Sequence, residues 1–121
     1  MEITGKKVLV VDDEDILRML LTDTLEFEGF QVDEAEDGLE GLKKIQENHY
    51  DVILLDYMMP HLTGLEVLER IQPLQLDTPV IMLTAKTQQA DQEAVIEKGA
   101  TYFVAKPFSP NELVTLLKSL F

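Results

Sequence analysis

The sequence predicts an α/β protein with a doubly wound (βα)5 architecture, in which a five-stranded parallel sheet lies between two layers of helices. Short apolar runs alternate with amphipathic stretches along the chain, and helix start signals lie between them. With 121 residues and 45% hydrophobic content, the chain is long enough to bury one core. No linker-like or low-complexity segment interrupts the alternation, so we expect one domain over residues 1–121.

Five short segments are predicted as strands. Four of them are apolar at successive positions: residues 8–11, 52–55, 80–83 and, with a weaker pattern, 102–104. Such runs are typical of strands buried on both faces of a parallel sheet. Residues 31–35 instead alternate between apolar and polar side chains, which indicates an edge strand.

Five other stretches place apolar residues at helical spacing. The stripes are Ile16, Leu17, Leu20, Leu21, Thr24 and Leu25; Leu39, Leu42 and Ile45; Leu65, Leu68 and Ile71; Ala90, Ala94 and Val95; and Leu113, Leu116, Leu117 and Leu120. Three of these helices follow a capping side chain with an acid three residues later, the signature of a capping box. These pairs are Asp37 with Glu40, Thr63 with Glu66, and Ser109 with Glu112.

Charge and composition exclude several classes of function. The chain has 23 acidic and 10 basic residues, a net charge of −13, so this domain alone is a poor binder of nucleic acid or anionic membranes. It contains no cysteine, which excludes disulfides, thiolate metal ligands and a cysteine nucleophile. No apolar run is long enough to span a membrane and no signal peptide is evident, so we expect a cytoplasmic protein.

Polar residues follow the strands where ligands bind in open α/β sheets, beyond the carboxyl ends. Asp12, Asp13 and Glu14 follow the first strand, and Asp56 follows the third. Thr84 follows the fourth strand, and Lys106 with Pro107 follows the fifth. Because these ends meet at one edge of the sheet, the three carboxylates of Asp12, Asp13 and Asp56 converge there with a hydroxyl and an ammonium.

This convergence suits phosphoryl transfer. Hard oxygen ligands of high charge favour Mg²⁺ or Ca²⁺ over zinc. Beside a cation, Asp56 can act as a nucleophile while Lys106 and Thr84 bind the oxygens of a phosphoryl group. Each residue has a plainer alternative: the acids can favour a helix N-terminus, Asp56 and Thr84 can cap turns, and Lys106 can be a surface charge. The joint arrangement favours the functional interpretation.

The sequence resembles a response-regulator receiver domain of two-component signal transduction along essentially its whole length. The matching segments are residues 8–14, residues 51–60, Gly64, residues 79–85, and the stretch that begins at Gly99 and Ala100 and ends at residues 106–108. The resemblance implies a flavodoxin-like receiver fold and a phosphorylation-dependent switch in a phosphorelay. The resemblance also implies that the chain is not an enzyme on other substrates and would catalyse only its own phosphoryl transfer and slow dephosphorylation. Asp56 would accept the phosphoryl group from a histidine kinase or phosphotransfer protein.

The resemblance also implies a magnesium site and a switch. Asp13, Asp56 and the backbone carbonyl of Met58 would coordinate Mg²⁺ directly, and Asp12 would hold it through water. Thr84 and Lys106 would bind phosphoryl oxygens, and the Lys106–Pro107 bond would be cis.

On phosphorylation, Thr84 would move inward and Phe103 would follow it. Many members of the family have tyrosine at this position, so the phenylalanine must be driven by packing alone; its alternative is a static core residue. Tyr102, one residue earlier, should point to the other face of the sheet. The positions that tune phosphoryl lifetime are Met58 and Lys86. Neither can orient an attacking water, which predicts slow self-dephosphorylation.

Partner surfaces are expected on two faces. The helix after the acids, with Asp15, Ile16, Arg18, Met19 and Thr22 in its early turns, would dock the kinase, although Ile16 and Met19 can equally be core. The fourth helix, fifth strand and fifth helix would carry the signal to an output domain or effector. Lys98, Lys118 and Gln92 are candidates to line this face; the alternative is that they are ordinary solvated surface residues. Phosphorylation could also drive dimerisation. The chain is either a stand-alone receiver or a receiver cut from a longer regulator.

Three other functions compete with the switch. A Mg²⁺-dependent aspartate-nucleophile phosphatase also uses an Asp after a buried strand, but it requires a second Asp where this chain has Met58. A pseudo-receiver that is not phosphorylated would lack Asp56, Asp13 or Lys106, and all three are present. A nucleotide binder would carry a glycine-rich loop after the first strand, which this sequence lacks.

Overall fold

The computed structural model describes residues 4–85, 96–106 and 108–121, and within them it confirms the predicted α/β class. The strands are β1 (Lys7–Val11), β2 (Gln31–Ala35), β3 (Val52–Asp56), β4 (Val80–Ala85) and β5 (Tyr102–Lys106). The helices are α1 (Asp15–Phe27), α2 (Gly38–Glu47), α3 (Gly64–Ile71) and α5 (Pro110–Ser119), with a 3-10 turn η1 (Gln72–Leu74). The predicted stripe of Ala90, Ala94 and Val95 lies outside the described residues.

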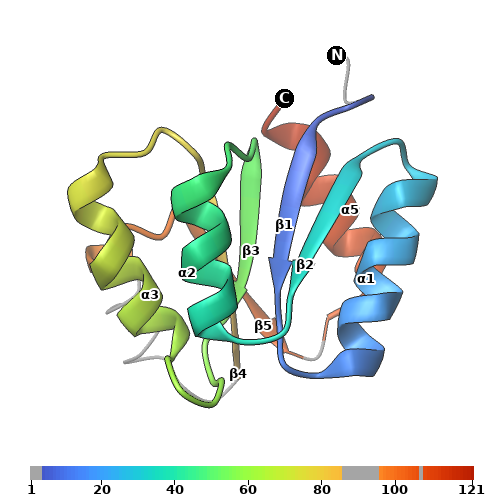
Figure 1. The fold of residues 1–121 in the computed structure, drawn as a ribbon. Helices are drawn as coiled ribbons and strands as arrows, with labels where there is room; N and C mark the ends of the chain where they lie inside the picture. Colours follow the sequence, from blue (N-terminus) through green and yellow to red (C-terminus); the bar gives the residue numbers. More distant parts are fainter. Residues whose placement is uncertain (1–3, 86–95, 107) are drawn as a thin grey trace.

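The five strands form one parallel sheet in the order β2-β1-β3-β4-β5. All the strands run toward the lower edge of the view in Figure 1, so their carboxyl ends meet there. β2 is an edge strand, as its alternating sequence predicts, and it pairs with β1 from Lys7 opposite Gln31 to Val11 opposite Ala35. β1 and β3 lie side by side at the centre, which brings the ends of the two acid-bearing strands together.

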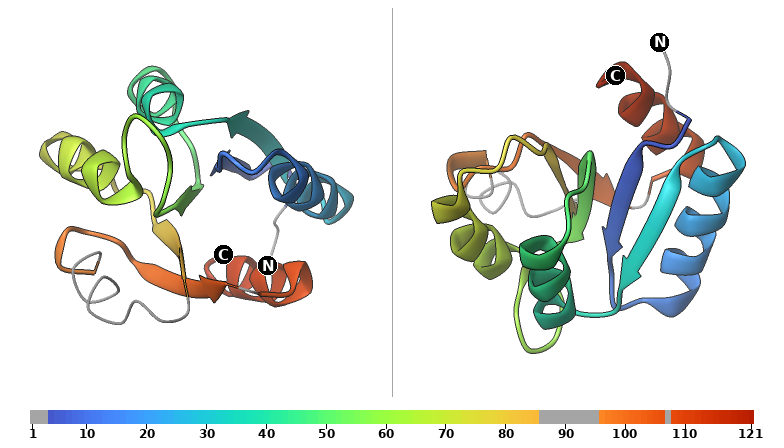
Figure 2. Two further views of the ribbon diagram at one scale, coloured as in Figure 1. Left: turned by 90° about the horizontal axis from the view of Figure 1, so that it is seen from below. Right: turned by 45° about the horizontal axis from the view of Figure 1, so that its top comes forward.

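Alternating side chains of the central strands build two cores. Leu9, Val11 and Ile53 pack toward α2 and α3, whereas Val8 and Val10 pack on the opposite face with the buried leucines of α1 and α5. Figures 1 and 2 show the helix pairs on opposite sides of the sheet. Because both faces of β1, β3 and β4 are covered, these strands carry apolar residues at successive positions.

The predicted helix start signals all cap their helices, but only one is a full capping box. Thr63 accepts from the backbone N–H of Glu66, and the Glu66 carboxylate accepts from the N–H of Thr63. Asp37 caps α2 in one direction only, because the Glu40 carboxylate accepts from the N–H of Glu36 instead. Ser109 accepts from the N–H groups of Asn111 and Glu112.

Burial corrects the sequence analysis at three places. On α1, the side chains of Ile16 and Leu20 are exposed, so the predicted apolar stripe is wider than the core face that it supplies. Leu39 on α2 is also exposed. β5 is a second edge strand rather than one buried on both faces, and its Tyr102 and Phe103 are exposed. Among the described residues, every helix is too short or too polar to cross a bilayer.

Gly64 lets the segment after β3 turn tightly into α3. A Cβ at this position would lie 2.4 Å from the carbonyl oxygen of Asp56 and 2.9 Å from Sδ of Met82. The Gly64 N–H donates to the carbonyl of Tyr57 at 2.8 Å, which holds the chain just beyond Asp56 against the helix start. Glycine is therefore required by the close approach of the backbone.

We expect Gly64→Ala to lower the free energy of unfolding by about 1–3 kcal/mol, because the added methyl group overlaps backbone that cannot move away. Urea denaturation followed by circular dichroism measures this change. Arg70→Ala, on the exposed part of the same helix, is the control and should change stability by no more than about 0.5 kcal/mol. Equal stability of the two variants would contradict the packing argument.

Candidate functional site

The predicted site residues converge at the carboxyl edge of the sheet. Asp12 directly follows β1, Asp56 ends β3, and Lys106 ends β5. Asp12 is fully buried and Asp56 is 5% exposed, whereas Asp13 is exposed. Thr84, in the last part of β4, is buried beside them. Five residues from distant parts of the sequence therefore meet because the parallel strands end together.

Lys106 is the cation that faces the acids. Its Nζ lies 3.1 Å from Oδ1 of Asp56, 3.6 Å from Oδ2 of Asp12 and 2.9 Å from Oε1 of Glu14. An ammonium group has three protons to donate and no lone pair, so it suits a group of carboxylate oxygens. One ammonium cannot balance the charge of four acids, since Asp13 also lies in the cluster.

The loop after β1 is held by backbone and side-chain hydrogen bonds. Oδ1 of Asp12 accepts from the N–H of Glu14 at 2.8 Å, and the N–H of Asp12 donates to the carbonyl of Ala35 at 3.1 Å. Arg18 on α1 donates to the carbonyl of Asp12 at 2.6 Å and also pairs with Glu34 at 3.0 Å. The guanidinium thus ties the acid loop to strand β2.

Burial raises the pKa values of both inner acids. The pKa of Asp56 rises from 3.8 to about 7, chiefly because burial disfavours the charged form and secondly because Asp12 repels it; Lys106 opposes both effects. The pKa of Asp12 is also raised, with burial again the main cause. The pKa of Lys106 is raised because its contacts with the carboxylates outweigh its own burial. Near neutral pH the site therefore favours an added cation.

The acids fit a hard divalent cation. Asp12, Asp13 and Asp56 each offer a carboxylate oxygen, and these oxygens lie within 4.8 Å of one another. Oδ2 of Asp12 is buried and has no hydrogen-bond partner among the described residues, although the Lys106 ammonium lies 3.6 Å away. A buried carboxylate oxygen that lacks a donor is suited to ligate a metal, and an all-oxygen set favours Mg²⁺ or Ca²⁺.

Four other residues were predicted to belong to the site, and only two of them, Met58 and Phe103, are among the described residues. The side chain of Met58, two residues after Asp56, is 58% exposed, and Phe103 on β5 is 41% exposed. Phe103 is therefore not the static core residue of the alternative interpretation. Lys86 and Pro107, and with Pro107 the predicted cis bond, lie outside the described residues.

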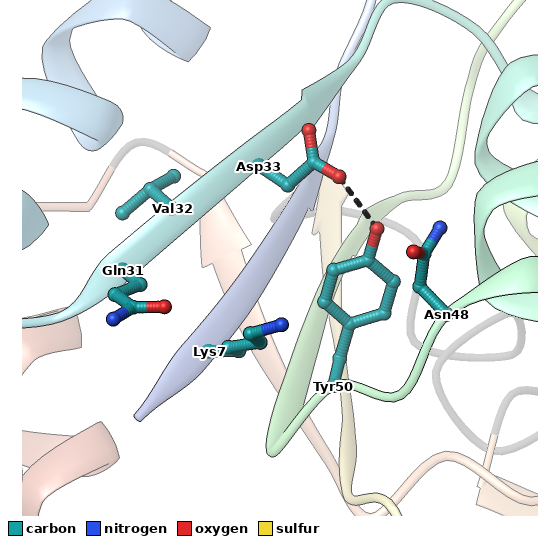
Figure 3. Close-up of a pocket in the computed structure, with 6 residues that line it drawn as sticks. All are labelled: Lys7, Gln31, Val32, Asp33, Asn48 and Tyr50. Carbon is teal, nitrogen blue, oxygen red and sulfur yellow. Dashed lines mark hydrogen bonds between the residues drawn. The ribbon is translucent and has the colours of Figure 1, made fainter. Parts of the chain in front are cut away.

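A second hollow lies at the opposite edge of the sheet and has a structural explanation. It is lined by Lys7, Gln31, Val32, Asp33, Asn48 and Tyr50 (Figure 3). The Tyr50 hydroxyl donates to Asp33 at 2.6 Å, and Lys44 pairs with the same carboxylate at 3.1 Å. These bonds lower the pKa of Asp33 despite its partial burial. They tie edge strand β2 to the segment before β3, far from the acid cluster.

Sequence reasoning missed two contributors to the site. The sequence marks Glu14 only as part of the acidic run, because its contact with Lys106 joins residues 92 positions apart. Its signal was a glutamate at a helix N-cap, where shorter side chains are preferred. Arg18 was placed in the first turns of the helix, but its bond to the Asp12 carbonyl depends on the course of the loop and has no sequence signature.

Solved structures with the same fold are CheY-like signalling domains. The Francisella response regulator 1452 receiver domain superposes with a TM-score of 0.90 at 34% identity, covering 96% of each chain. The chemotaxis protein CheY4 of Vibrio cholerae superposes with a TM-score of 0.88 at 37% identity and covers 98% of this chain and 100% of its own. The fold thus defines a class of two-component signalling domain.

Sequence comparison identifies the same family. A family model described as the response regulator receiver domain matches residues 8–118. The transcriptional regulatory protein ResD of Bacillus subtilis (strain 168) is 47% identical over 114 residues, which cover 94% of this chain and 47% of ResD. SrrA of Staphylococcus aureus (strain NCTC 8325 / PS 47) is 42% identical over 116 residues, which cover 96% of this chain and 48% of SrrA. The chain belongs to the response regulator receiver domain family.

Family membership supports a general role in phosphorylation-dependent signalling, as the sequence predicted. The curated relatives are regulators rather than metabolic enzymes, which agrees with the expectation of a switch. This chain spans about half the length of these relatives.

The raised pKa of Asp56 makes stability depend on pH. Between the unfolded value of 3.8 and the folded value of about 7, the folded protein holds more protons than the unfolded chain. The contribution of Asp56 to the free energy of unfolding therefore falls as the pH rises through this range. Without divalent cations, we expect Asp56→Asn to be more stable than wild type by about 1–3 kcal/mol at pH 8, with a smaller difference at pH 5.

Urea denaturation in EDTA at several pH values measures this difference. Asp23→Asn, an exposed substitution on α1 that removes the same charge, should show no such pH-dependent gain. If Asp56→Asn is no more stable than wild type at pH 8, Lys106 fully offsets the burial of the ionised carboxylate and the electrostatic argument is wrong.

Proposed function

We propose that Asp56 accepts a phosphoryl group from a histidine of a sensor kinase or phosphotransfer protein in a Mg²⁺-dependent reaction. The observation that carries this proposal is the contact of 3.1 Å between the buried Asp56 carboxylate and the Lys106 ammonium, within a cluster of acids that fits a divalent cation. In the reaction, a phosphorus–nitrogen bond on the donor breaks and a bond from phosphorus to an Asp56 oxygen forms. The donor imidazole leaves as the neutral ring once it is protonated.

The residues of this chain have separate roles in the proposal. Asp13, Asp56 and the Met58 carbonyl hold Mg²⁺ directly, and Asp12 holds it through water. Bound there, the ion supplies positive charge that neutralises phosphoryl oxygens and favours ionised Asp56. Ionisation matters because the nucleophile is the carboxylate, and burial together with repulsion from Asp12 raises the pKa of Asp56 to about 7 even with Lys106 beside it.

Lys106 and Thr84 provide the remaining contacts with the phosphoryl group. The Lys106 ammonium moves from the Asp56 carboxylate to a phosphoryl oxygen, and the Thr84 hydroxyl donates to another. We propose that Thr84 then moves inward and that Phe103, which is exposed in the structure, follows into the space left behind. The inward movement of the Phe103 side chain would change the surface formed by the predicted fourth helix, β5 and α5.

Candidate residues on the output face are engaged in ion pairs. Lys98 lies 3.5 Å from Glu69, and Lys118 lies 2.5 Å from Glu28, while Gln92 is outside the described residues. Lys98 and Lys118 are thus in contacts that a partner would have to rearrange. We propose an output domain or effector protein as that partner, supported by relatives that are named transcriptional regulators. A phosphorylation-linked dimer is a second route to the same output.

The kinase surface is proposed on α1, next to the acid loop. Ile16 is 79% exposed and Met19 is 58% exposed, so both are available as anchors rather than core residues. Ile16 lines an open hollow together with Glu14, Asp15, Leu17 and Leu20. An apolar patch bordered by acids, adjacent to Asp56, suits a helical partner that must bring a phosphohistidine to the carboxylate. We place this exchange in the cytoplasm.

A phosphatase remains the alternative of a different class, and the geometry disfavours it. Such an enzyme needs a second carboxylate two residues after the nucleophile to protonate its leaving group. Met58 occupies that position with an exposed thioether side chain that cannot transfer protons.

We expect acetyl phosphate with saturating Mg²⁺ to phosphorylate the wild-type protein and to leave Asp56→Asn unmodified. Intact mass spectrometry measures the added phosphoryl group, and EDTA should prevent its addition. Asp51→Asn, which removes a half-buried carboxylate just before β3 that accepts from the N–H of Lys7, is the control and should be modified like wild type. Modification of Asp56→Asn to the wild-type extent would exclude Asp56 as the acceptor. Sustained hydrolysis of p-nitrophenyl phosphate would favour the phosphatase.

We also expect slow self-dephosphorylation, with a phosphoryl lifetime of minutes or longer, because the Met58 side chain cannot orient an attacking water. Decay of radiolabelled protein after removal of the donor measures the lifetime. Met58→Asn should shorten it several-fold by adding an amide at this position, whereas Met58→Leu should leave it unchanged. Loss of the label from wild type within seconds, without a phosphatase, would contradict this prediction.

A further inference from the structure

Glu14 occupies the N-cap position of α1 but does not cap the helix. Its backbone is extended (φ −83°, ψ 102°), and its side chain accepts no hydrogen bond from the first turn. Serine, threonine, aspartate and asparagine are preferred at this position because a short side chain can reach the free N–H groups. The side chain of Glu14 instead crosses to the end of β5, where Oε1 lies 2.9 Å from Nζ of Lys106.

Three carboxylates in the described part of the chain contact Lys106, and Glu14 makes the shortest of these contacts. The distances from Nζ are 2.9 Å to Glu14, 3.1 Å to Asp56 and 3.6 Å to Asp12. Asp12 and Asp56 are buried, whereas the side chain of Glu14 is 61% exposed at the mouth of the site. The Lys106 ammonium is therefore shared between the buried acids and an exposed carboxylate outside them.

We propose that Glu14 is a positioning residue that restrains Lys106 in the unphosphorylated protein and slows phosphorylation by competing for the ammonium group. This inference rests on the proposed function, in which Lys106 binds an oxygen of the incoming phosphoryl group. An ammonium can serve several oxygens at once, but its partners share a limited set of three protons and one unit of charge. A carboxylate already bound to Nζ weakens the contact available to the phosphoryl oxygen.

Two substitutions at residue 14 separate this restraint from a general effect of charge. Glu14→Gln removes the charge and keeps the length of the side chain, while Glu14→Asp keeps the charge and shortens the side chain by one methylene. If contact with Lys106 is what slows the reaction, both variants should react faster with acetyl phosphate. The expected gain in second-order rate constant at saturating Mg²⁺ is about two- to fivefold, the size expected for loss of one partly exposed ion pair.

The matched control is Asp23→Asn, which removes one negative charge from α1 about 13 Å further along the helix and should react at the wild-type rate. Thermal melts check that each variant is folded. Glu14→Asp should melt at or above the wild-type temperature, because aspartate is a good N-cap residue. A stability change of this sign cannot by itself account for a faster reaction.

A double-mutant cycle tests whether the effect passes through Lys106. We compare each double variant, Glu14→Gln or Glu14→Asp combined with Lys106→Ala, with Lys106→Ala alone. The ratio of the two rate constants should be about one, because the contact that residue 14 makes is already absent. Acceleration by Glu14→Gln but not by Glu14→Asp would overturn the proposal in favour of simple charge repulsion of the donor. Acceleration that persists without Lys106 would overturn it too, as would wild-type rates in both variants.

In each of these results Asp56 still becomes phosphorylated; a wild-type protein that is not modified would instead refute the proposed function.

Discussion

Burial of Asp12 and Asp56 opposite the Lys106 ammonium is the constraint on which the site depends. The apolar runs of β1 and β3 bring these carboxylates to the sheet edge and remove them from water. Burying a charge is unfavourable unless it is paired, and here one ammonium serves three carboxylates. The fold therefore holds a cluster whose pKa values are raised and whose unbalanced negative charge favours a divalent cation.

The surrounding structure keeps this unfavourable cluster in place. Arg18 binds the carbonyl of Asp12, and Gly64 allows the backbone after Asp56 to turn closely into α3. Neither residue contacts the proposed phosphoryl group, yet both hold loops that carry its ligands. Glu14 links α1 to the end of β5 through Lys106, so helix, acid loop and strand are coupled at one ammonium. A site that destabilises its own fold in this way is commonly retained for function.

Much of the fold was predictable because its signals are local. Successive apolar residues marked the strands, and the Thr63–Glu66 box marked the start of α3 within one residue. The errors concern the width of buried faces. Ile16 and Leu39 belong to the predicted apolar stripes of their helices, but both side chains are exposed. The apolar run of β5 predicts a strand buried on both faces, but the strand order places β5 at an edge of the sheet and Phe103 is exposed.

The sequence by itself determined the class of fold and the identity of the residues that meet at the sheet edge, since parallel strands that end together must bring their following residues together. Only the tertiary structure decided how those residues share their charges. The contact between Glu14 and Lys106, the bond from Arg18 to the Asp12 carbonyl and the raised pKa of Asp56 all depend on distances between segments far apart in the chain. Such distances follow from strand order and loop course, which no local pattern of residues encodes.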